Sequence, residues 1–343
     1  MSRALKLGMT FGYWAKGPNP DVVEHAQVAE SLGFDSIWTA ESWGNDAFTF
    51  AAWVAAHTKR VRIGTGIVQM AARTPVATAM AAATIDHLSG GRFILGLGVS
   101  GPQVVEGWYG QPSARPLART REYVEIIRRV LRREDGPLNF AGEFYQHPYS
   151  GPGSVGLGKP LKLMIHPLRA EMPIFIAAEG PKNVTQTAEI ADGWLPLYYS
   201  PWRQEIYADQ LVSAKSNFEI TALVHFAITD DIAAGLLPVK QMLGFYIGGM
   251  GAKGQNYHTK LMQRMGFEEE ALRIQELFFE GRRDEAILAV PDAFADEISL
   301  VGPPSRIRER LEAWRESPVT TLLIGGGSRS PADLKQLADL VGN

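Results

Sequence analysis

One carboxylate stands where a parallel α/β protein places its catalytic groups. The segment FDSIWTAE (residues 34–41) has the composition of a buried strand and stops at Glu41. The functional groups of parallel α/β folds lie at the carboxyl ends of their strands, and a carboxylate in an apolar pocket can serve as a general acid or base. We predict that Glu41 handles the proton of a reaction. A helix-capping or salt-bridged glutamate is the alternative, and Glu106, Glu179 or a bound water would then be the proton donor.

Large aromatic side chains gather in the segments that follow predicted strands. Trp14, Trp43, Trp108 and Tyr198 come from four separate loops. Because the carboxyl ends of parallel strands meet at one face, these side chains would converge on an apolar pocket for a hydrophobic or conjugated substrate. For any single one of them, rim packing or a subunit interface is the alternative.

Metal and thiolate chemistry find no support in the sequence. The chain has no cysteine, which excludes a disulfide framework, a thiolate nucleophile and a thiolate metal site. Its seven histidines are scattered without the spacing of a metal site. We therefore expect no metal centre.

Eight segments have the apolar composition of buried strands, and most are followed by a segment with helical spacing. The predicted strands are Leu5–Phe11, Ser36–Ala40, Val61–Val68, Phe93–Val99, Ile174–Ala178, Trp194–Leu197, Glu219–Ile228 and Thr320–Ile324. This alternation predicts an α/β fold, a TIM (β/α)8 barrel, with a doubly wound open sheet as the rival. The barrel is favoured because the glycine pattern that begins at Gly96 and Gly98 does not complete a dinucleotide fingerprint.

Three stretches interrupt the alternation of strands and helices. Residues 138–147 and 161–165 are expected to form a hairpin excursion, and residues 202–215 a helix. Residues 230–300 are predicted to be mostly helical, without a clear strand. We therefore expect one domain over residues 1–343, with a helical insertion at about 230–300 after the seventh strand.

Length and charge limit the class of protein. At 343 residues and 45% hydrophobic residues, the chain can fill one large barrel. A net charge of −3 argues against a nucleic-acid partner, because neutralising phosphates requires a basic face. The N-terminus lacks the apolar region of a signal peptide, and no stretch approaches the ~18 apolar residues of a membrane span. We expect a cytoplasmic protein with a small organic substrate and no membrane partner, and a homodimer is left open.

The segments at the strand ends resemble the bacterial luciferase-like family, in particular its branch that uses the deazaflavin coenzyme F420. The resemblance rests on GFDSIWTAE from residue 33, RVRIGTGIV from 60, HLSGGRFILGLGVSG from 87, MPIFIAAEGPKNVTQTAEIADGW from 172 and the C-terminal VGPPSRIRERLEAWRESPVTTLLIGGG. These segments occur in family order over about residues 5–325. The resemblance implies a TIM-barrel oxidoreductase that binds its flavin or deazaflavin at the carboxyl end of the barrel.

The resemblance also places the cofactor on particular residues. A tricyclic ring needs a flat slot with close backbone approach, which Gly64, Gly66 and Gly98 can offer. The alternative is that these glycines relieve crowding inside the barrel. Family members carry a cis peptide at the position of Gly66–Ile67, so we predict that this bond is cis and backs the ring. Ser100, just after the strand that holds Gly98, is predicted to belong to the same cofactor site.

A phosphate site is expected at the turn Ala177-Ala178-Glu179-Gly180, because small residues before a helix N-terminus form an anion site. Glu179 departs from the smaller residue usual in the family. Its charge would repel a phosphate unless its side chain points away. The turn Gly325–Ser328 is the competing phosphate loop, since barrels often bind phosphate after their last strands.

The resemblance implies hydride transfer between F420 and an organic substrate. Glu41 matches the family's acidic position, whereas Ser42 stands where the sugar-phosphate dehydrogenases of the family have histidine. This difference favours the reduction of an activated C=C or C=O bond over alcohol oxidation. An FMN-dependent monooxygenase that uses externally reduced flavin, and a non-catalytic flavin- or deazaflavin-binding protein, are the alternatives.

Overall fold

Eight parallel strands close a ring in the computed structural model, which describes residues 4–14, 16–325 and 330–342. β10 pairs with β9 and β12 pairs with β1, which completes the circle. The fold is therefore the predicted TIM barrel. In ring order the strands are β1 (Lys6–Thr10), β2 (Ser36–Thr39), β3 (Arg62–Thr65), β5 (Phe93–Gly98), β8 (Ile174–Ala177), β9 (Gly193–Leu195), β10 (Glu219–Ile228) and β12 (Thr321–Gly325).

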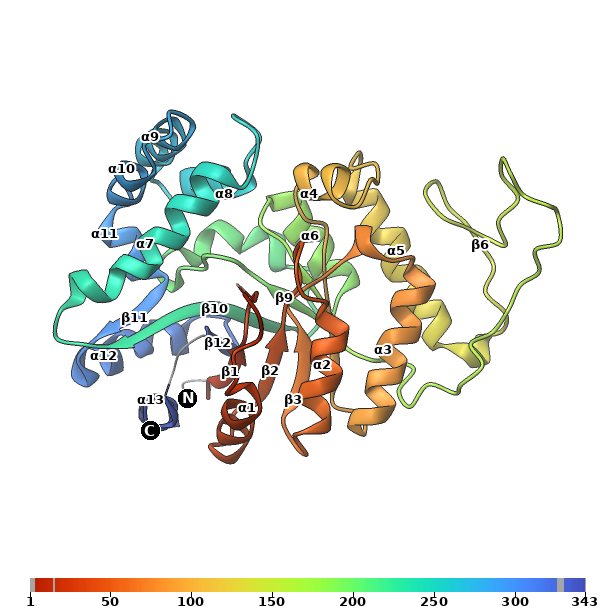
Figure 1. Cartoon of the computed structure of the whole chain (residues 1–343), viewed down its shortest axis with the longest axis horizontal. Coiled ribbons are helices and arrows are strands. Elements are labelled where there is room, and N and C mark those ends of the chain that lie inside the picture. Colours follow the sequence, from red (N-terminus) through yellow and green to blue (C-terminus); the bar gives the residue numbers. More distant parts are fainter. Residues whose placement is uncertain (1–3, 15, 326–329, 343) are drawn as a thin grey trace.

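Helices surround the ring, as Figure 1 shows. Several of them begin with proline in the first turn, where the missing N–H group leaves no hydrogen bond unmade. The helices outside the insertion are α1 (Val22–Ser31), α2 (Ala47–Ala56), α3 (Pro75–Ser89), α4 (Pro102–Gly107), α5 (Pro116–Leu131), α6 (Pro181–Ile190), α12 (Pro304–Glu316) and α13 (Pro331–Gly342). Among the helices of the described residues, none is long and apolar enough to cross a membrane.

The third predicted strand is divided into two. β3 ends at Thr65, and the chain resumes pairing with β5 only at β4 (Val68–Gln69). The Thr65 hydroxyl replaces the missing ladder bonds, because it donates to the Gly96 carbonyl and accepts from the Gly96 N–H, both at 2.9 Å. This break places a bulge at the carboxyl end of the barrel, followed by a short 3-10 helix, η1 (Met70–Ala72).

The interior of the ring is filled by large side chains that face small ones. Trp38 and Phe175 lie 5.7 Å apart between ring centroids, and both are fully buried. Gly64 leaves the space that the Trp38 ring occupies, and Gly193 does the same for Phe175. Ile94, Leu195 and Leu323 complete this inner cluster, so the barrel is packed rather than open.

The insertion after the seventh strand is helical, as predicted, but it ends in a strand that was not expected. β11 (Ser299–Gly302) pairs in parallel with the second half of β10, whose first half pairs with β12. The prediction of no strand between residues 230 and 300 was therefore wrong, because these four residues gain their partners from a strand some 70 positions earlier. The insertion helices are α7 (Ile232–Gly249), α8 (Tyr257–Arg264), α9 (Glu268–Phe279), α10 (Arg283–Leu288) and α11 (Asp292–Glu297).

Two other predicted elements differ from the structure. The expected helix at 202–215 consists of two short 3-10 helices, η3 (Pro201–Tyr207) and η4 (Asp209–Leu211). Arg203 has a non-helical backbone inside η3, and its guanidinium binds both carboxylate oxygens of Glu297 at 2.7 and 2.8 Å. This ion pair between distant segments holds Arg203 in a backbone conformation that is not helical.

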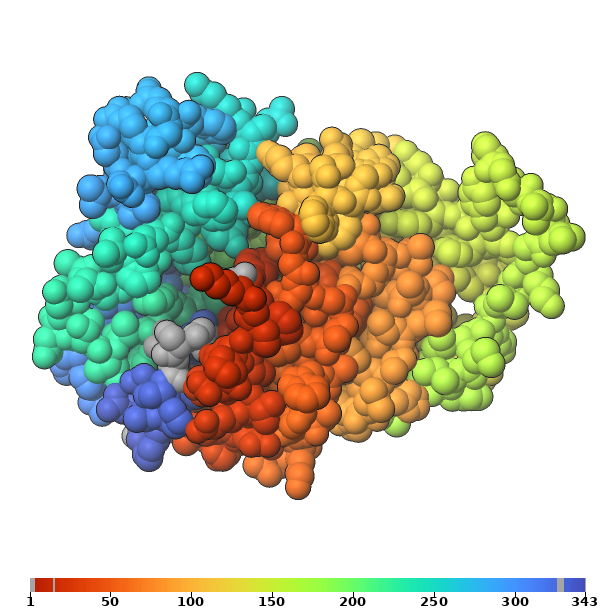
Figure 2. Space-filling view, viewed as in Figure 1, coloured from red at the N-terminus to blue at the C-terminus, as the bar shows by residue number. Residues whose placement is uncertain are grey.

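The hairpin excursion is present between α5 and β8, but it is shorter than expected. It consists of β6 (Phe140–Ala141) and β7 (Gln146–His147), after a 3-10 turn, η2 (Arg133–Asp135). Residues 161–165 are not a strand and contribute one backbone bond, from the Leu138 N–H to the Leu161 carbonyl. Figure 2 shows this stretch in yellow-green, projecting from one end of the molecule.

Candidate active site

Glu41 lies just beyond the end of β2, and both of its carboxylate oxygens accept hydrogen bonds. Arg73 donates to Oε1 at 2.7 Å and to Oε2 at 3.0 Å. The backbone N–H groups of Gln69 and Ala47 donate to Oε1 at 2.8 Å and to Oε2 at 3.1 Å. With 3% of its surface exposed, Glu41 makes the bonds of a salt bridge and of a helix cap. Its role in proton handling stays a prediction.

Asp46 extends this network into the first turn of α2. Its side chain accepts from the Thr49 N–H at 2.6 Å, as the N-cap of the helix, and it also pairs with Arg73. Burial acts to lower the pKa of Arg73, but its bonds to Glu41 and Asp46 outweigh that effect and raise the pKa. Arg73 is therefore a permanent cation, held between two carboxylates at the mouth of the barrel.

The peptide bond between Gly66 and Ile67 is cis, as predicted from the resemblance. It lies in the break between β3 and β4, and the Ile67 side chain packs against Gly98 of β5. An added Cβ at Gly98 would lie 2.7 Å from Cδ1 of Ile67, so only glycine leaves room for this side chain. That the bulge backs a cofactor ring stays a prediction.

Two of the strand glycines leave space that other parts of the barrel occupy. A Cβ at Gly64 would lie 2.4 Å from the Trp38 ring, and one at Gly96 would lie 1.7 Å from the Thr65 carbonyl oxygen. Relief of crowding inside the barrel thus explains why both positions are glycine. A Cβ at Gly66 would meet Trp38 at an ordinary 3.5 Å. Cofactor contacts of Gly64 and Gly66 stay predictions.

A cavity of about 560 Å³ opens beside the ends of β4 and β5. Ser100, Met70 and Arg73 form its wall on the barrel side, and the backbone of Ser100 is left-handed, with φ 62°. Arg119 of α5 and Tyr257 of α8 contribute from other sides. Both the barrel and the insertion therefore line a space of the size that binds small organic ligands.

The side chain of Glu179 turns toward the insertion. Its Oε1 lies 2.8 Å from Nδ1 of His258, and Arg264 donates to its backbone carbonyl at 2.9 Å. The Tyr198 ring lies 5.9 Å from the His258 ring, and burial, with Tyr246 and Glu179 nearby, raises the pKa of Tyr198. Glu179 is thus engaged with residues of the insertion, and binding of a phosphate by the turn at 177–180 stays a prediction.

The four aromatic residues predicted for a substrate pocket do not share one wall. Trp14, Trp43 and Trp108 are exposed, whereas Tyr198 is buried. None of the four lines the cavity described above, and their role in a substrate pocket stays a prediction. The aromatic residues on the wall of the cavity are Phe144, Tyr145 and Tyr257.

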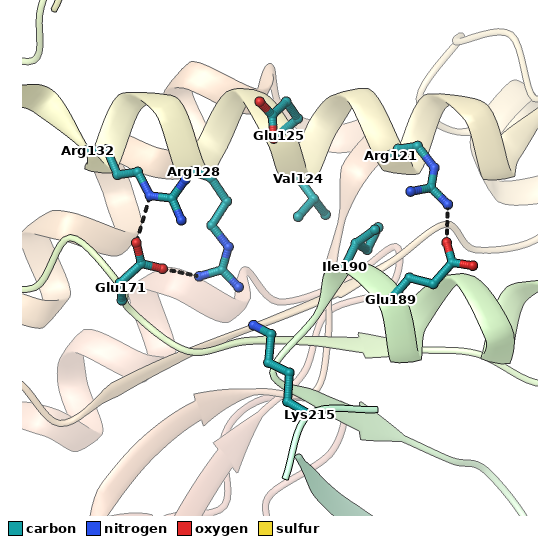
Figure 3. A pocket seen from close by; sticks show the side chains of 9 residues that line it. All are labelled: Arg121, Val124, Glu125, Arg128, Arg132, Glu171, Glu189, Ile190 and Lys215. Carbon is teal, nitrogen blue, oxygen red and sulfur yellow. Dashed lines mark hydrogen bonds and ion pairs between the residues drawn. The ribbon is translucent and has the colours of Figure 1, made fainter. Parts of the chain in front are cut away.

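A second cavity, of about 450 Å³, lies at the level where β8 and β10 begin. Figure 3 shows Glu171 between Arg132 and Arg128 on one side of it, with Lys215 reaching into the space. Arg132 donates to Glu171 at 2.6 Å. The amino ends of barrel strands serve stability rather than catalysis in TIM barrels, so we place the candidate site at the cavity beside β4 and β5. The competing phosphate loop, Gly325–Ser328, lies outside the described residues beyond Gly325.

Comparison with known proteins places the chain in a family. Residues 9–321 match the family model of luciferase-like monooxygenases. The chain belongs to this family. Among its luciferase-like relatives, a Mycobacterium tuberculosis protein provisionally named a coenzyme F420-dependent oxidoreductase is 47% identical, over 99% of this chain and 100% of its own. The 5,10-methylenetetrahydromethanopterin reductase of Archaeoglobus fulgidus is 27% identical, over 93% and 92%. The predictions of a luciferase-like enzyme and of kinship with the F420-dependent branch are confirmed.

Solved structures agree on the fold of this luciferase-like chain. The coenzyme F420-dependent tetrahydromethanopterin reductase from Methanopyrus kandleri superposes with a TM-score of 0.75 at 22% identity, over 97% of both chains. An F420-dependent secondary alcohol dehydrogenase in complex with an F420-acetone adduct gives 0.72 at 19% identity, over 98% of both. At these identities the likeness shows the TIM barrel alone.

Three residues of the candidate site were not found from the sequence. Arg73 is 32 positions from Glu41, in a stretch without a motif, and His258 was one of several scattered histidines. Of the three, only Arg119 could have been placed from its neighbours in the sequence. It precedes the buried Tyr123 by four positions on α5, which places it toward the inner face of that helix.

Proposed function

We propose that the chain is a coenzyme F420-dependent oxidoreductase that transfers a hydride between the deazaflavin and an organic substrate, in the direction of reducing an activated C=C or C=O bond. The observation that carries the choice of cofactor is the 47% identity over 99% of the chain to a relative provisionally named for F420. Ser42 in place of the histidine of the sugar-phosphate dehydrogenases supports the reductive direction.

The residues beside β4 and β5 fit such a cofactor. A cavity of about 560 Å³ suits a small organic ligand, and the cationic Arg119 on its wall suits the anionic groups of F420. The break between β3 and β4 lies at the neighbouring strand ends. When bound, the deazaflavin supplies the hydride chemistry.

The chain's own residues would bind and orient the ligand and shield it from water. Arg73, fixed by Glu41 and Asp46, holds the ends of β2 and β4 against α2, and so keeps the mouth of the barrel in one geometry. Ser100 and Tyr257, both on the wall of the cavity, would confine the ligand. Glu41 remains our proposed proton-handling residue, and proton transfer from it would require that one of its four donors gives way.

An FMN-dependent monooxygenase is the second candidate, because the matching family model is that of luciferase-like monooxygenases. The two functions differ in the cofactor that the protein binds. Titrating the purified protein with F420 and with FMN, while following the quenching of tryptophan fluorescence, separates them.

We expect binding of F420 in the micromolar range and much weaker binding of FMN. Micromolar binding of FMN without binding of F420 would overturn the proposal. Reduced F420 should then be oxidised in the presence of enone or ketone substrates. Tight F420 binding without turnover for any acceptor would instead favour a non-catalytic deazaflavin-binding protein.

A further inference from the structure

The cavity beside β4 and β5 contains one positive charge that the described residues do not neutralise. Arg73 is paired with Glu41 and Asp46, and the acidic residue on the wall, Glu143, is paired with Arg115. For Arg119, in contrast, no carboxylate of the described part of the chain forms an ion pair. An unpaired guanidinium beside a cavity is a strong site for an anion, because charge-assisted bonds are about twice as strong as neutral ones.

The guanidinium of Arg119 is nevertheless held in place. Its central carbon lies 4.8 Å from the centre of the Phe144 ring, a cation–π contact that fixes the plane of the group. The Tyr145 hydroxyl is also close enough to Arg119 to form a hydrogen bond, which acts to lower the pKa of Tyr145, although burial raises that pKa overall. The Nε atom of Arg119 is buried and has no acceptor among the described residues.

The polar groups around Arg119 favour an anion as well. Helices α3 and α5 both begin at the cavity, because Thr74, the N-cap of α3, and Pro116, the first residue of α5, lie on its wall. The N-terminus of a helix carries a partial positive charge. Ser100 stands on the same wall with a left-handed backbone, a conformation that serine rarely adopts.

We propose that this cavity is an anion-binding subsite in which Arg119 binds a carboxylate or phosphate group of a small organic ligand. Arg119 is suited to this because its planar group can donate two parallel hydrogen bonds to either anion. The anion could belong to the tail of the coenzyme or to the substrate. Which of the two it is rests on the proposed function, whereas the presence of the subsite does not.

The first experiment measures the binding of inorganic phosphate by calorimetry to the full chain and to its variants. Arg119→Gln should weaken binding at least tenfold, as expected for the loss of a charge-assisted hydrogen bond. Arg119→Lys keeps the charge and should weaken it less. Arg121→Gln is the matched control, since Arg121 lies on the same helix, pairs with the exposed Glu189 and lines the other cavity. It should bind phosphate within about twofold of the wild type.

Equal phosphate affinity in the wild type and Arg119→Gln, with both folded by circular dichroism, would overturn the proposal. Absence of binding to the wild type at phosphate concentrations up to about 50 mM would do the same. If Arg119→Gln does not fold, Arg119→Lys takes its place in the test. If Arg119→Lys binds phosphate as tightly as the wild type while Arg121→Gln binds it more weakly, phosphate responds to the general charge of the protein and the proposal is overturned.

The second experiment identifies the source of the anion, by titrating phosphate in the presence of saturating F420. If the coenzyme tail occupies the subsite, F420 abolishes phosphate binding, and Arg119→Gln weakens F420 at least tenfold without affecting a deazaflavin that lacks the tail. If the substrate occupies it, phosphate still binds to the F420 complex. Both results support the subsite. If no variant binds F420, the proposed function fails, while the phosphate titration still reports on Arg119.

Discussion

Arg73 donates two hydrogen bonds to Glu41, from its two terminal nitrogens to the two carboxylate oxygens, at 2.7 and 3.0 Å. The pair joins the end of β2 to the segment after β4, and Gln69 and Ala47 add backbone donors to the same carboxylate. A catalytic carboxylate would need an oxygen that faces the substrate. Four N–H groups of the described residues donate to the Glu41 carboxylate, which gives it a clear structural role whether or not it also moves a proton.

Glu41→Gln should lower the free energy of unfolding by about 3 kcal/mol. The amide leaves Arg73 with Asp46 as its one carboxylate partner. The new N–H₂ group would face N–H donors, which cannot accept a hydrogen bond from it. Urea denaturation measures the loss. A change below about 0.5 kcal/mol would contradict it.

The same variant tests proton handling. If Glu41 is the general acid, turnover per folded molecule falls by ~10²–10⁴-fold, with F420 affinity little changed. If turnover per folded molecule stays within about threefold, the proton donor is elsewhere. Glu179 is the next candidate, because it lies 2.8 Å from His258 and its Oε2 has no hydrogen-bond partner among the described residues.

Gly96→Ala should be strongly destabilising, by about 1–3 kcal/mol or more, because the new Cβ would lie 1.7 Å from the Thr65 carbonyl oxygen. The backbone of β3 would have to move to relieve this clash, and the Thr65 hydroxyl would lose its bonds to β5. Gly44→Ala is the matched control, since its Cβ meets nothing within 4 Å. Equal melting temperatures for the two variants would refute this account of the barrel interior.

The barrel was readable from the sequence because its strands are continuous apolar runs, buried on both faces. The range predicted for the seventh strand, Glu219–Ile228, is the range found. β11 was missed because four residues, SLVG, form a strand only beside the far half of β10. The expected helix at 202–215 was wrong for a similar reason, since the bond from Arg203 to Glu297 spans 94 positions.

The candidate site was less readable than the fold. The prediction of a cis bond at Gly66–Ile67 rested on the family resemblance, together with the glycine of GTGIV, which removes the crowding of a Cβ. The partners of Glu41 and the orientation of Glu179 depend on where Arg73 and His258 lie in space. Side-chain pairs between distant segments leave no periodic signal, so sequence reasoning could name the carboxylates but not what they bind.

Asp192 should contribute stability that is lost in acid. Burial acts to raise its pKa, but Arg128, Lys215 and the Ile174 N–H outweigh that effect and hold the pKa below the usual 3.8. The contribution is therefore complete above the unfolded-state pKa and declines as the pH falls through the folded-state pKa. Asp192→Asn should cost about 1–3 kcal/mol near pH 7.

Urea titrations of the wild type and Asp192→Asn at several pH values check this. The difference in unfolding free energy should be constant above about pH 5 and shrink below about pH 4, because the unfolded state then binds the proton more readily. Glu189→Gln, which removes an exposed ion pair with Arg121, should cost less than about 0.5 kcal/mol. If the difference in unfolding free energy between the wild type and Asp192→Asn does not depend on pH, the lowered pKa of Asp192 is contradicted.

Gly180→Ala tests whether the turn before α6 holds the phosphate of the coenzyme. A Cβ at Gly180 meets no atom of the protein within 4 Å, and the backbone at φ −72° suits alanine. Stability should therefore change by less than about 1 kcal/mol, the modest cost of alanine at an N-cap. A phosphate bound against this turn would be crowded by the methyl group, so F420 affinity should fall about tenfold or more.

A deazaflavin without the phosphate tail should bind as before, and Gly17→Ala, at an open loop position, should leave F420 affinity unchanged. Equal F420 affinity in Gly180→Ala and the wild type would move the phosphate away from α6, to the Arg119 cavity or to the turn after β12.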